Sequence, residues 1–463
     1  MIKNSIFCMF GFKLKTKSIS SLSIGIIGGG PAGIAAAIKL NQYGFKVVLF
    51  NASKPNQVVV GEHLAAEALH EFKKLNIPVT ILNDHSIPCS EVQNAWGDSE
   101  IHHNESIFNP FGESYILSRP DFDNALLKYC EKLGVKVYLE NRVSKIIKNE
   151  TNWTLFFNKE KIEADFVIDA SGRTSKFNFD IVEPKKNKKD TLIGITKHLI
   201  DKQVEPVCKS HLLVESTSNG WWYTVQVATG ETVSTFMTDP KVLTTSGVSH
   251  SEFWKQQLKD SIHTKARLNF KQVPEEVYIQ SAHSQITSQV YGERWLKVGD
   301  AAQSFDPLSS AGIIKGFKMG QAAANALFNF SNGDTNALIV YESDIKKQYK
   351  DYLIKREEYY KQESRWVNRP FWYERILLIK EIKKFTITPM CYFKITNEDV
   401  DQKITFLRDQ VPNIDFLKLV SCIERFPVIK DAIGSYLNSQ SQIEMNPLLL
   451  HALEAMKIIK LIV

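Results

Sequence analysis

Three glycines have the spacing of a loop that binds the phosphates of a dinucleotide. Gly28 permits a tight turn, Gly30 lets the backbone approach a pyrophosphate, and Gly33 lets a helix pack closely against a strand. Apolar residues predict strands over 24–27 and 46–50 with an alanine-rich helix between them, which is the context that this motif requires. The N–H groups at the start of that helix would face two phosphates. The residues predicted to form the loop are Gly28, Gly30, Pro31, Ala32 and Gly33.

The residue at the end of the second predicted strand is Asn51. Dinucleotide-binding units usually carry Asp or Glu there to bind the ribose hydroxyls. An amide can also accept a hydrogen bond from a hydroxyl, although more weakly than a carboxylate. We therefore expect Asn51 to contact the ribose and other residues to share the binding.

The composition is that of an ordinary globular protein. The chain has 463 residues, of which 43% are hydrophobic and 23% charged, and a formal net charge of +6. This length allows two or three domains. Residues 185–189 are rich in lysine, but no nucleic-acid motif accompanies them, so we expect no nucleic-acid partner. The uncharged segment 18–38 contains the glycine loop, so no transmembrane segment is predicted there.

The six cysteines are far apart and form no CxxC or Cys/His cluster. The sequence therefore predicts neither a metal site nor a disulfide framework, which favours a reducing, cytoplasmic location. Residues 1–61 contain no acidic residue and several lysines. We interpret 1–21 as a basic N-terminal extension, with a targeting segment as the alternative.

Four further motifs, together with the glycine loop, resemble the p-hydroxybenzoate hydroxylase class of FAD proteins, which includes the tryptophan halogenases. They are Arg119 at the start of a helix, Asp169-Ala170-Ser171-Gly172-Arg173, Gly299-Asp300-Ala301-Ala302, and Asp306-Pro307. The resemblance covers residues 22 to about 375. A second set of segments is most similar to halogenase-like flavoproteins that modify tryptophan in partner proteins and so mature quinone cofactors. This set is Gly61-Glu62, Trp96-Gly97, Arg119-Pro120-Asp121-Phe122-Asp123, Gly220-Trp221-Trp222-Tyr223, and Glu363-Ser364-Arg365-Trp366 with Pro370-Phe371-Trp372.

The resemblance implies an α/β (α+β) fold with three parts. Residues 22–190 and 286–335 would form a Rossmann-like FAD-binding domain, with 55–115 contributing to the substrate side. Residues 191–285 would form an inserted, mainly antiparallel β-sheet substrate domain. Residues 336–463 would form a helical C-terminal region. Residues 87–97 show no regular pattern, whereas 143–157 alternate like strands of a small meander.

FAD is the cofactor that the resemblance implies, since one dinucleotide unit and a distant Gly-Asp pair fit a cofactor that spans two parts of the fold. Asp300 is expected at the ribityl hydroxyls. The loop from Pro307 to Ile313 would aim N–H groups at the electron-rich edge of a reduced flavin. Asp169 and Arg173 are interpreted as structural. The predicted cofactor contacts outside the glycine loop are Asn51, Arg119, Val143, Asp300, Pro307, Gly312 and Ile313.

The favoured activity is oxygen insertion into an aromatic substrate by a flavin C4a-hydroperoxide. The substrate would be an indole or tryptophan, either a small molecule or part of a peptide or protein, and O₂ would be the second substrate. Trp221, Tyr223 and Trp96 are predicted to line the aromatic pocket, with packing of the Trp221–Tyr223 strand on the core as the alternative. Glu62 and His63 are the candidate catalytic residues, because a histidine can take a proton near neutral pH.

Three alternatives remain open at the sequence level. A flavin-dependent halogenase would carry a lysine, a Trp-x-Trp-x-Ile-Pro stretch and a loop glutamate. In this chain Tyr223 replaces the second tryptophan and Ser309 replaces the glutamate. A saturating reductase would need no O₂, and a flavin-bound maturation partner would dock through its helical region. Because no second GxGxxG is present, electrons would come from transient NAD(P)H or from a separate flavin reductase.

Overall fold

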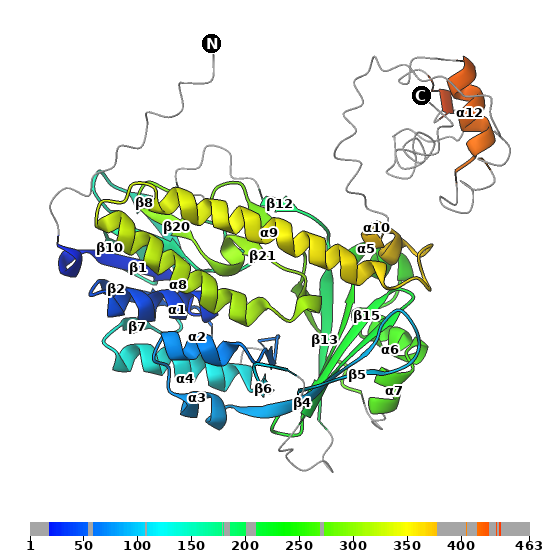
Figure 1. Cartoon of the computed structure of the whole chain (residues 1–463), viewed down its shortest axis with the longest axis horizontal. Coiled ribbons are helices and arrows are strands. Elements are labelled where there is room, and N and C mark those ends of the chain that lie inside the picture. Colours follow the sequence, from blue (N-terminus) through cyan, green and yellow to red (C-terminus); the bar gives the residue numbers. More distant parts are fainter. Residues whose placement is uncertain are drawn as a thin grey trace. The chain divides into compact units, whose positions relative to one another are not determined.

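The chain divides into two compact units, residues 1–365 and 366–463, in a computed structural model (Figure 1). The described residues are 18–53, 59–106, 109–177, 179, 186–200, 210–268, 273–376, 404, 414–425, 432 and 435–436. Most of the predicted basic extension, and most of the predicted helical region beyond residue 376, lie outside these ranges. No helix among the described residues is long and apolar enough to cross a membrane.

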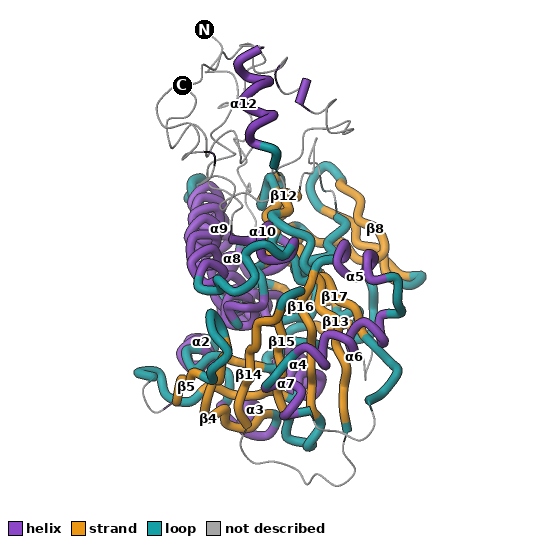
Figure 2. Tube along the Cα trace, turned by 90° about the vertical axis from the view of Figure 1, so that its right-hand side faces the viewer, coloured by secondary structure: helices purple, strands orange, loops and turns teal. Residues whose placement is uncertain are grey.

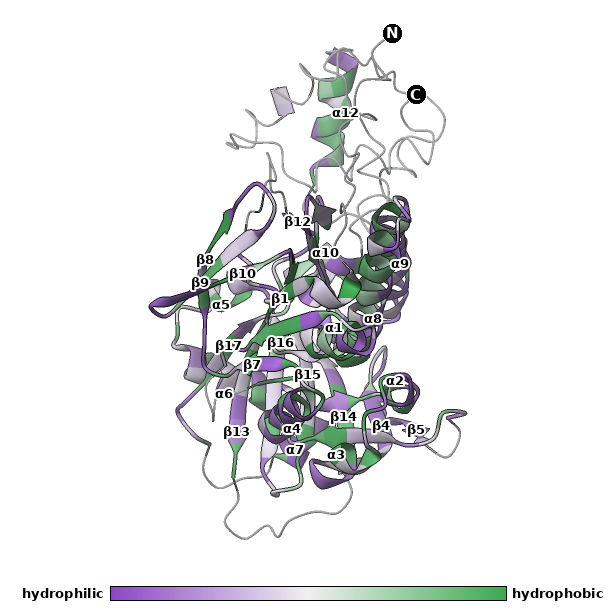
Figure 3. Ribbon diagram, turned by 90° about the vertical axis from the view of Figure 1, so that its left-hand side faces the viewer, coloured by the Kyte–Doolittle hydropathy of each residue, from purple (hydrophilic) through white to green (hydrophobic). Residues whose placement is uncertain are grey.

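A six-stranded sheet forms the centre of the first unit and confirms the Rossmann-like prediction. Its order is β19-β20-β11-β1-β2-β7, and all neighbours except β19 and β20 pair in parallel. The strands are β1 (Ser23–Ile27), β2 (Lys46–Phe50), β7 (Lys136–Tyr138), β11 (Phe166–Asp169), β19 (Tyr291–Gly292) and β20 (Trp295–Lys297). The alternation that normally marks a strand is weak here, because β1 and β11 are buried on both faces. Figure 3 shows the apolar character of β1.

Helices α1 (Pro31–Gln42) and α8 (Gly312–Ser331) pack against each other beside this sheet (Figure 1). Two glycines of α8 permit the close approach. A Cβ at Gly320 would lie 2.4 Å from the Ala32 carbonyl oxygen, and one at Gly316 would lie 3.0 Å from the Cβ of Pro31. The first turn of α1 therefore lies against the second and third turns of α8. Helices α2 (Ala68–Lys74), α3 (Val79–Asp84) and α4 (Arg119–Lys132) complete this side.

A nine-stranded sheet forms the second layer, and its pairing is antiparallel except between β14 and β4 (Figure 2). Its central path is β17-β13-β16-β15-β14-β4-β6-β3, with β5 paired to β4. The strands are β3 (His63–Leu64), β4 (Ser86–Ala95), β5 (His102–Glu105), β6 (Ser114–Leu117), β13 (Ile193–Leu199), β14 (Ser210–Thr217), β15 (Gly220–Gln226), β16 (Thr232–Thr238) and β17 (Tyr278–Ser281). Segments from 63–117 and 193–281 thus share one sheet.

Three helices cover the outer face of this sheet: α5 (Pro240–Ser246), α6 (His250–Asp260) and α7 (His263–Arg267). Trp222 of β15 and Trp254 of α6 are both fully buried there, with ring centroids 5.0 Å apart. The opposite face of the sheet borders a cavity.

Two smaller sheets and a long helix complete the first unit. The predicted meander is present as β8 (Val143–Lys148) and β9 (Trp153–Phe157), and β10 (Glu160–Ala164) adds a third strand that was not predicted. The second small sheet joins β12 (Lys186–Lys188), β18 (Gln285–Thr287) and β21 (Gln303–Ser304). Helix α9 (Ala337–Lys361) follows α8. In the second unit, α10 (Pro370–Ile376) and α12 (Phe416–Arg425) are described.

Candidate FAD and substrate site

A cavity of about 990 Å³ is bounded by the first turns of α1 and α8 and by one face of the nine-stranded sheet. This volume is at the upper end for ligand pockets. Eight of the predicted cofactor residues line it, namely Gly30, Pro31, Ala32, Arg119, Asp300, Pro307, Gly312 and Ile313. The structure therefore brings together segments that are nearly 300 residues apart in the sequence.

The glycine loop has the tight geometry that the sequence predicts. A Cβ at Gly28, whose φ is +120°, would lie 2.2 Å from the Ala170 carbonyl oxygen. A Cβ at Gly33 would lie 1.9 Å from the Gly28 carbonyl oxygen, whereas Gly30 faces open space. Gly28 and Gly33 are therefore packing positions, and Gly30 leaves room for a ligand at the start of α1. This cradle fits a pyrophosphate.

Asn51 and Val143 are not among the residues that line the cavity. Asn51 follows β2, and its side-chain oxygen accepts a hydrogen bond from the Ser53 backbone N–H at 3.4 Å. Ser53 does line the cavity. Val143 is buried in an apolar cluster with Phe50 and Phe157. The predicted contacts of Asn51 and Val143 with FAD stay predictions.

Arg119 is buried at the start of α4 and fixes the turn before β3. Its Nη1 donates to the carbonyl oxygens of Val60 and Gly61, both at 2.8 Å, and its Nη2 donates to Asp123 at 3.0 Å. Its Nε is buried without a hydrogen-bond partner. An unsatisfied buried donor is unfavourable, so this nitrogen suits a ribityl or phosphate oxygen of the cofactor.

Asp300 lines the cavity and pairs with two cationic side chains. It accepts from Lys315 Nζ at 2.6 Å and pairs with Arg173 Nε at 3.0 Å. Burial alone would raise the pKa of Asp300, but the charges of Lys315 and Arg173 hold that pKa below its ordinary value. Asp300 is therefore ionised and can accept hydrogen bonds from ribityl hydroxyls.

Asp169 and Arg173 make the structural contacts that the sequence predicts. Asp169 accepts hydrogen bonds from Ser171 and Ser175 at the end of β11. Arg173 donates to the carbonyl oxygens of His283 and Phe305 at 2.8 and 2.7 Å. Arg173 also lines the cavity.

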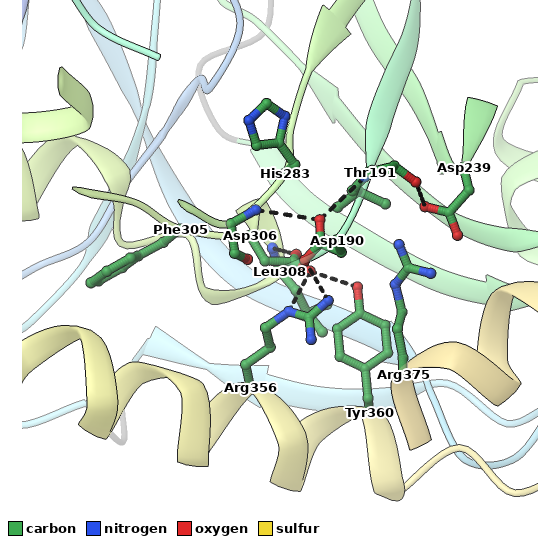
Figure 4. A network of polar contacts seen from close by, with 12 residues as sticks. Asp190, Thr191, Asp239, His283, Phe305, Asp306, Leu308, Arg356, Tyr360 and Arg375 are labelled. Atoms are coloured by element: carbon green, nitrogen blue, oxygen red, sulfur yellow. Dashed lines mark hydrogen bonds and ion pairs between the residues drawn. The ribbon is translucent and has the colours of Figure 1, made fainter. Parts of the chain in front are cut away.

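A buried network holds the loop that leads into α8 (Figure 4). Asp306 Oδ1 accepts from the Leu308 N–H at 3.0 Å. Asp306 Oδ2 accepts from Arg356 Nε at 3.2 Å and from the Tyr360 hydroxyl at 2.8 Å. Arg356 also pairs with Asp190, just before β13, at 2.9 Å. One arginine thus links the cofactor loop to the segment that enters the large sheet.

Glu62, His63 and Tyr223 meet at another part of the cavity wall. Both carboxylate oxygens of Glu62, both ring nitrogens of His63 and the Tyr223 hydroxyl are buried without a hydrogen bond of ordinary geometry. Burial raises the pKa of Glu62. It also lowers the pKa of His63 to about 4, so the imidazole is neutral at physiological pH. Burial and the neighbouring Glu62 raise the pKa of Tyr223 well above its ordinary value.

Trp221 and Trp96 lie elsewhere than the sequence predicts. Trp221 shares a sheet face with Tyr223, as the alternation predicts, but it is fully buried and does not line the cavity. Trp96 packs edge-on against it at 6.3 Å, and the Trp221 Nε1 donates to the Tyr360 hydroxyl at 3.1 Å. Of the three predicted pocket aromatics, only Tyr223 lines the cavity.

Lys315, Arg356 and Tyr360 were not identified from the sequence. The last two belong to a helix whose sequence reads as charged and solvent-facing, so their burial gave no local signal. Lys315 is the fourth residue of α8, and nothing in the local sequence indicates that it pairs with Asp300. Among the described residues, no cluster of His, Cys, Asp and Glu could hold a metal ion.

The fold and the cavity are those of a flavoprotein, and the comparisons with known proteins agree. The model of the FAD binding domain family matches residues 21–347. A protein described as an FAD-dependent oxidoreductase, LodB of Marinomonas mediterranea, is 29% identical over 359 residues, which are 76% of this chain and 95% of LodB. The chain belongs to the FAD-binding domain family, and it is an FAD-dependent oxidoreductase.

Two solved structures share this fold. The peptidyl tryptophan dihydroxylase QhpG has a TM-score of 0.64 and 21% identity, covering 81% of this chain and 82% of QhpG. The flavin-dependent halogenase CmlS has a TM-score of 0.68 and 19% identity, covering 95% of this chain and 77% of CmlS. At these identities the likeness concerns the fold alone.

Proposed function

We propose that this protein is an FAD-dependent monooxygenase that inserts oxygen into an electron-rich aromatic ring, with the indole of a peptide- or protein-bound tryptophan as the favoured substrate. The observation that carries the proposal is the continuity of one cavity. It joins the FAD-type loops at α1 and α8 to the face of the sheet that carries Tyr223, Glu62 and His63. An aromatic ring on that face would lie in the same enclosure as the flavin.

The cationic groups of the cavity favour a substrate without a free carboxylate. Arg173 is engaged by Asp300 and two backbone carbonyls. Arg119 is engaged by two carbonyls and Asp123, which leaves its Nε for the cofactor. No lysine is among the described residues that line the cavity. A tryptophan side chain within a peptide needs no carboxylate receptor, whereas free tryptophan does.

Bound, reduced FAD would supply the activation of O₂. Around it, Gly30 and the first turn of α1 would hold the pyrophosphate, and Asp300 would accept from the ribityl chain. His63 is neutral and its nitrogens lack protein partners, so it can take the proton of a ring N–H or O–H. Glu62 and the Tyr223 hydroxyl can hydrogen-bond the substrate, and the sheet behind them excludes water.

The same observations disfavour halogenation. The resemblance to halogenases implies a lysine and a loop glutamate, but no lysine is found on the described lining, and position 309 is a serine that bonds back to the Asp306 carbonyl oxygen. Trp221, at the position of the tryptophan stretch, is fully buried and is not among the residues that line the cavity. We also propose a cytoplasmic location, supported by the free thiols of Cys89 and Cys130.

The test is a product assay in which the electron donor, O₂ and the halide salt are varied separately. The FAD-loaded protein is reduced without air by NADH, by NADPH or by a separate flavin reductase, and is then mixed with O₂ and an aromatic substrate. Free tryptophan, N-acetyltryptophan amide and a tryptophan-containing peptide are compared by mass spectrometry with chloride or bromide present. The proposal expects a product whose mass has increased by that of added oxygen. More of this product should form from the peptide than from free tryptophan. A halogen isotope pattern, or a product formed equally well without O₂, would overturn it.

A further inference from the structure

A chain of hydrogen bonds connects the large sheet to the loop before α8, and it uses residues that have no other role in the site. The Trp221 Nε1 donates to the Tyr360 hydroxyl at 3.1 Å, and that hydroxyl donates to Asp306 Oδ2 at 2.8 Å. The side chains of Trp221 and Tyr360 are fully buried. The tyrosine hydroxyl is therefore satisfied as acceptor and donor, and its position is fixed from both sides.

Asp306 is held along its whole length. Its backbone N–H donates to the Tyr352 hydroxyl at 2.6 Å. Its Oδ1 accepts from the Leu308 N–H, and its Oδ2 accepts from Arg356 and Tyr360 (Figure 4). Arg356 and Tyr360 are one turn apart on α9, and the guanidinium lies over the tyrosine ring at 4.7 Å. Both side chains of α9 therefore hold the same buried carboxylate oxygen of Asp306.

The clamped residue begins the turn that aims α8 at the cavity. The chain passes from Asp306 through the 3-10 turn Pro307–Ser309 to Ser310, which has a left-handed φ of +48°. Gly312 then opens α8, and no side chain caps the N–H groups of its first turn. Pro307, Gly312 and Ile313 all line the cavity. These N–H groups favour negative charge beside them.

We propose that Tyr360, Trp221 and Arg356 are positioning residues for the flavin: through Asp306 they hold the loop 306–312 so that the first turn of α8 stabilises the negative charge of the reduced ring. This role rests on the FAD-binding fold and is independent of the substrate. It assigns Trp221 to the support of the cofactor loop rather than to an aromatic substrate pocket.

Tyr360→Phe is the direct test, because it removes one hydroxyl and leaves the ring. The matched control is Tyr359→Phe on the same helix, whose ring is 48% exposed and whose contact with Trp96 is made by the backbone oxygen. Flavin potential is measured in the FAD-loaded proteins by equilibration with reference dyes, without any substrate. We expect the ratio of reduced to oxidised flavin at a fixed potential to fall about tenfold in Tyr360→Phe, which is about 30 mV more negative for a two-electron couple.

A second readout uses the FAD-free proteins. Amide hydrogen exchange of residues 306–312 is expected to be faster in Tyr360→Phe than in the control, since the loop has lost an anchor. If Tyr360→Phe does not fold, Trp221→Phe removes the indole donor together with part of the ring, and it should change both readouts in the same direction by a smaller amount. A folded Tyr360→Phe with the flavin potential and loop exchange of Tyr359→Phe would overturn the proposal, as would an equal change in both variants.

Discussion

His63 gives the sharpest prediction, because its environment sets both its protonation and its effect on stability. Both ring nitrogens are buried without partners, and burial lowers the pKa of His63 from its ordinary 6.5 to about 4. A base with this pKa is available across the physiological range. Product formation that depends on His63 should therefore show no acidic limb near pH 6.5, and should decline only as the pH approaches about 4.

The same shift predicts a loss of stability in acid. The folded protein binds the His63 proton more weakly than the unfolded chain does, so its stability falls as the pH drops from 6.5 toward about 4. Once His63 is protonated in both states, this pKa shift corresponds to a loss of roughly 3 kcal/mol in the free energy of unfolding. His63→Gln removes the titrating group and should lose about that much less stability over the same interval.

The assay is urea unfolding of the FAD-saturated wild type, His63→Gln and the control His70→Gln, each at several pH values between about 7 and 4. His70 is exposed on α2, so its replacement is the matched control for loss of an imidazole that is not buried. In parallel, His63→Gln should slow product formation while retaining FAD. The reasoning is refuted if His63→Gln and wild type lose equal stability in acid, or if the mutant turns over normally.

Three further changes test other parts of the site. Gly320→Ala should destabilise the protein by about 1–3 kcal/mol in urea unfolding and weaken FAD binding, because its Cβ would lie 2.4 Å from the Ala32 oxygen; unchanged FAD affinity would contradict the packing argument. Asp300→Asn leaves Lys315 without its buried counter-charge. The combined loss in FAD-binding free energy and in free energy of unfolding should be about 3–5 kcal/mol. Fluorescence titration that shows wild-type affinity for FAD would refute this. Burial raises the pKa of Glu62, so the folded protein holds this proton more tightly than the unfolded chain does. Wild-type stability should therefore fall relative to that of Glu62→Gln as the pH rises above about 4.5. Unfolding midpoints that change equally in both proteins from about pH 5 to pH 8 would contradict this.

The cofactor half of the site could be predicted from the sequence because its signals are local. The glycine loop, the strands around it and the residues at the start of α8 lie in short motifs with a defined geometry. Arg119 could be recognised because a cation in the first turn of a helix is mildly unfavourable and needs a reason. Gly30, Arg119 and Gly312 line the cavity, whereas Gly28 and Gly33 serve the packing of the loop.

The substrate half depended on contacts between distant segments. β4 showed no clear pattern, because it gains its order from parallel pairing with β14 and antiparallel pairing with β6. The alternation in β15 placed Trp221 and Tyr223 on one face, but it could not show that Trp96 and Tyr360 cover Trp221. Burial by a remote helix leaves no mark in the local sequence.

Incorporation of isotopically labelled oxygen tests the central claim most directly. The reduced, FAD-loaded protein is mixed with a tryptophan-containing peptide and labelled O₂ in unlabelled water, and the product is analysed by mass spectrometry. The monooxygenase account predicts a product whose added oxygen carries the label and whose formation requires FAD. An added oxygen that comes from water, a halogenated product, or a change in the peptide without O₂ would contradict it.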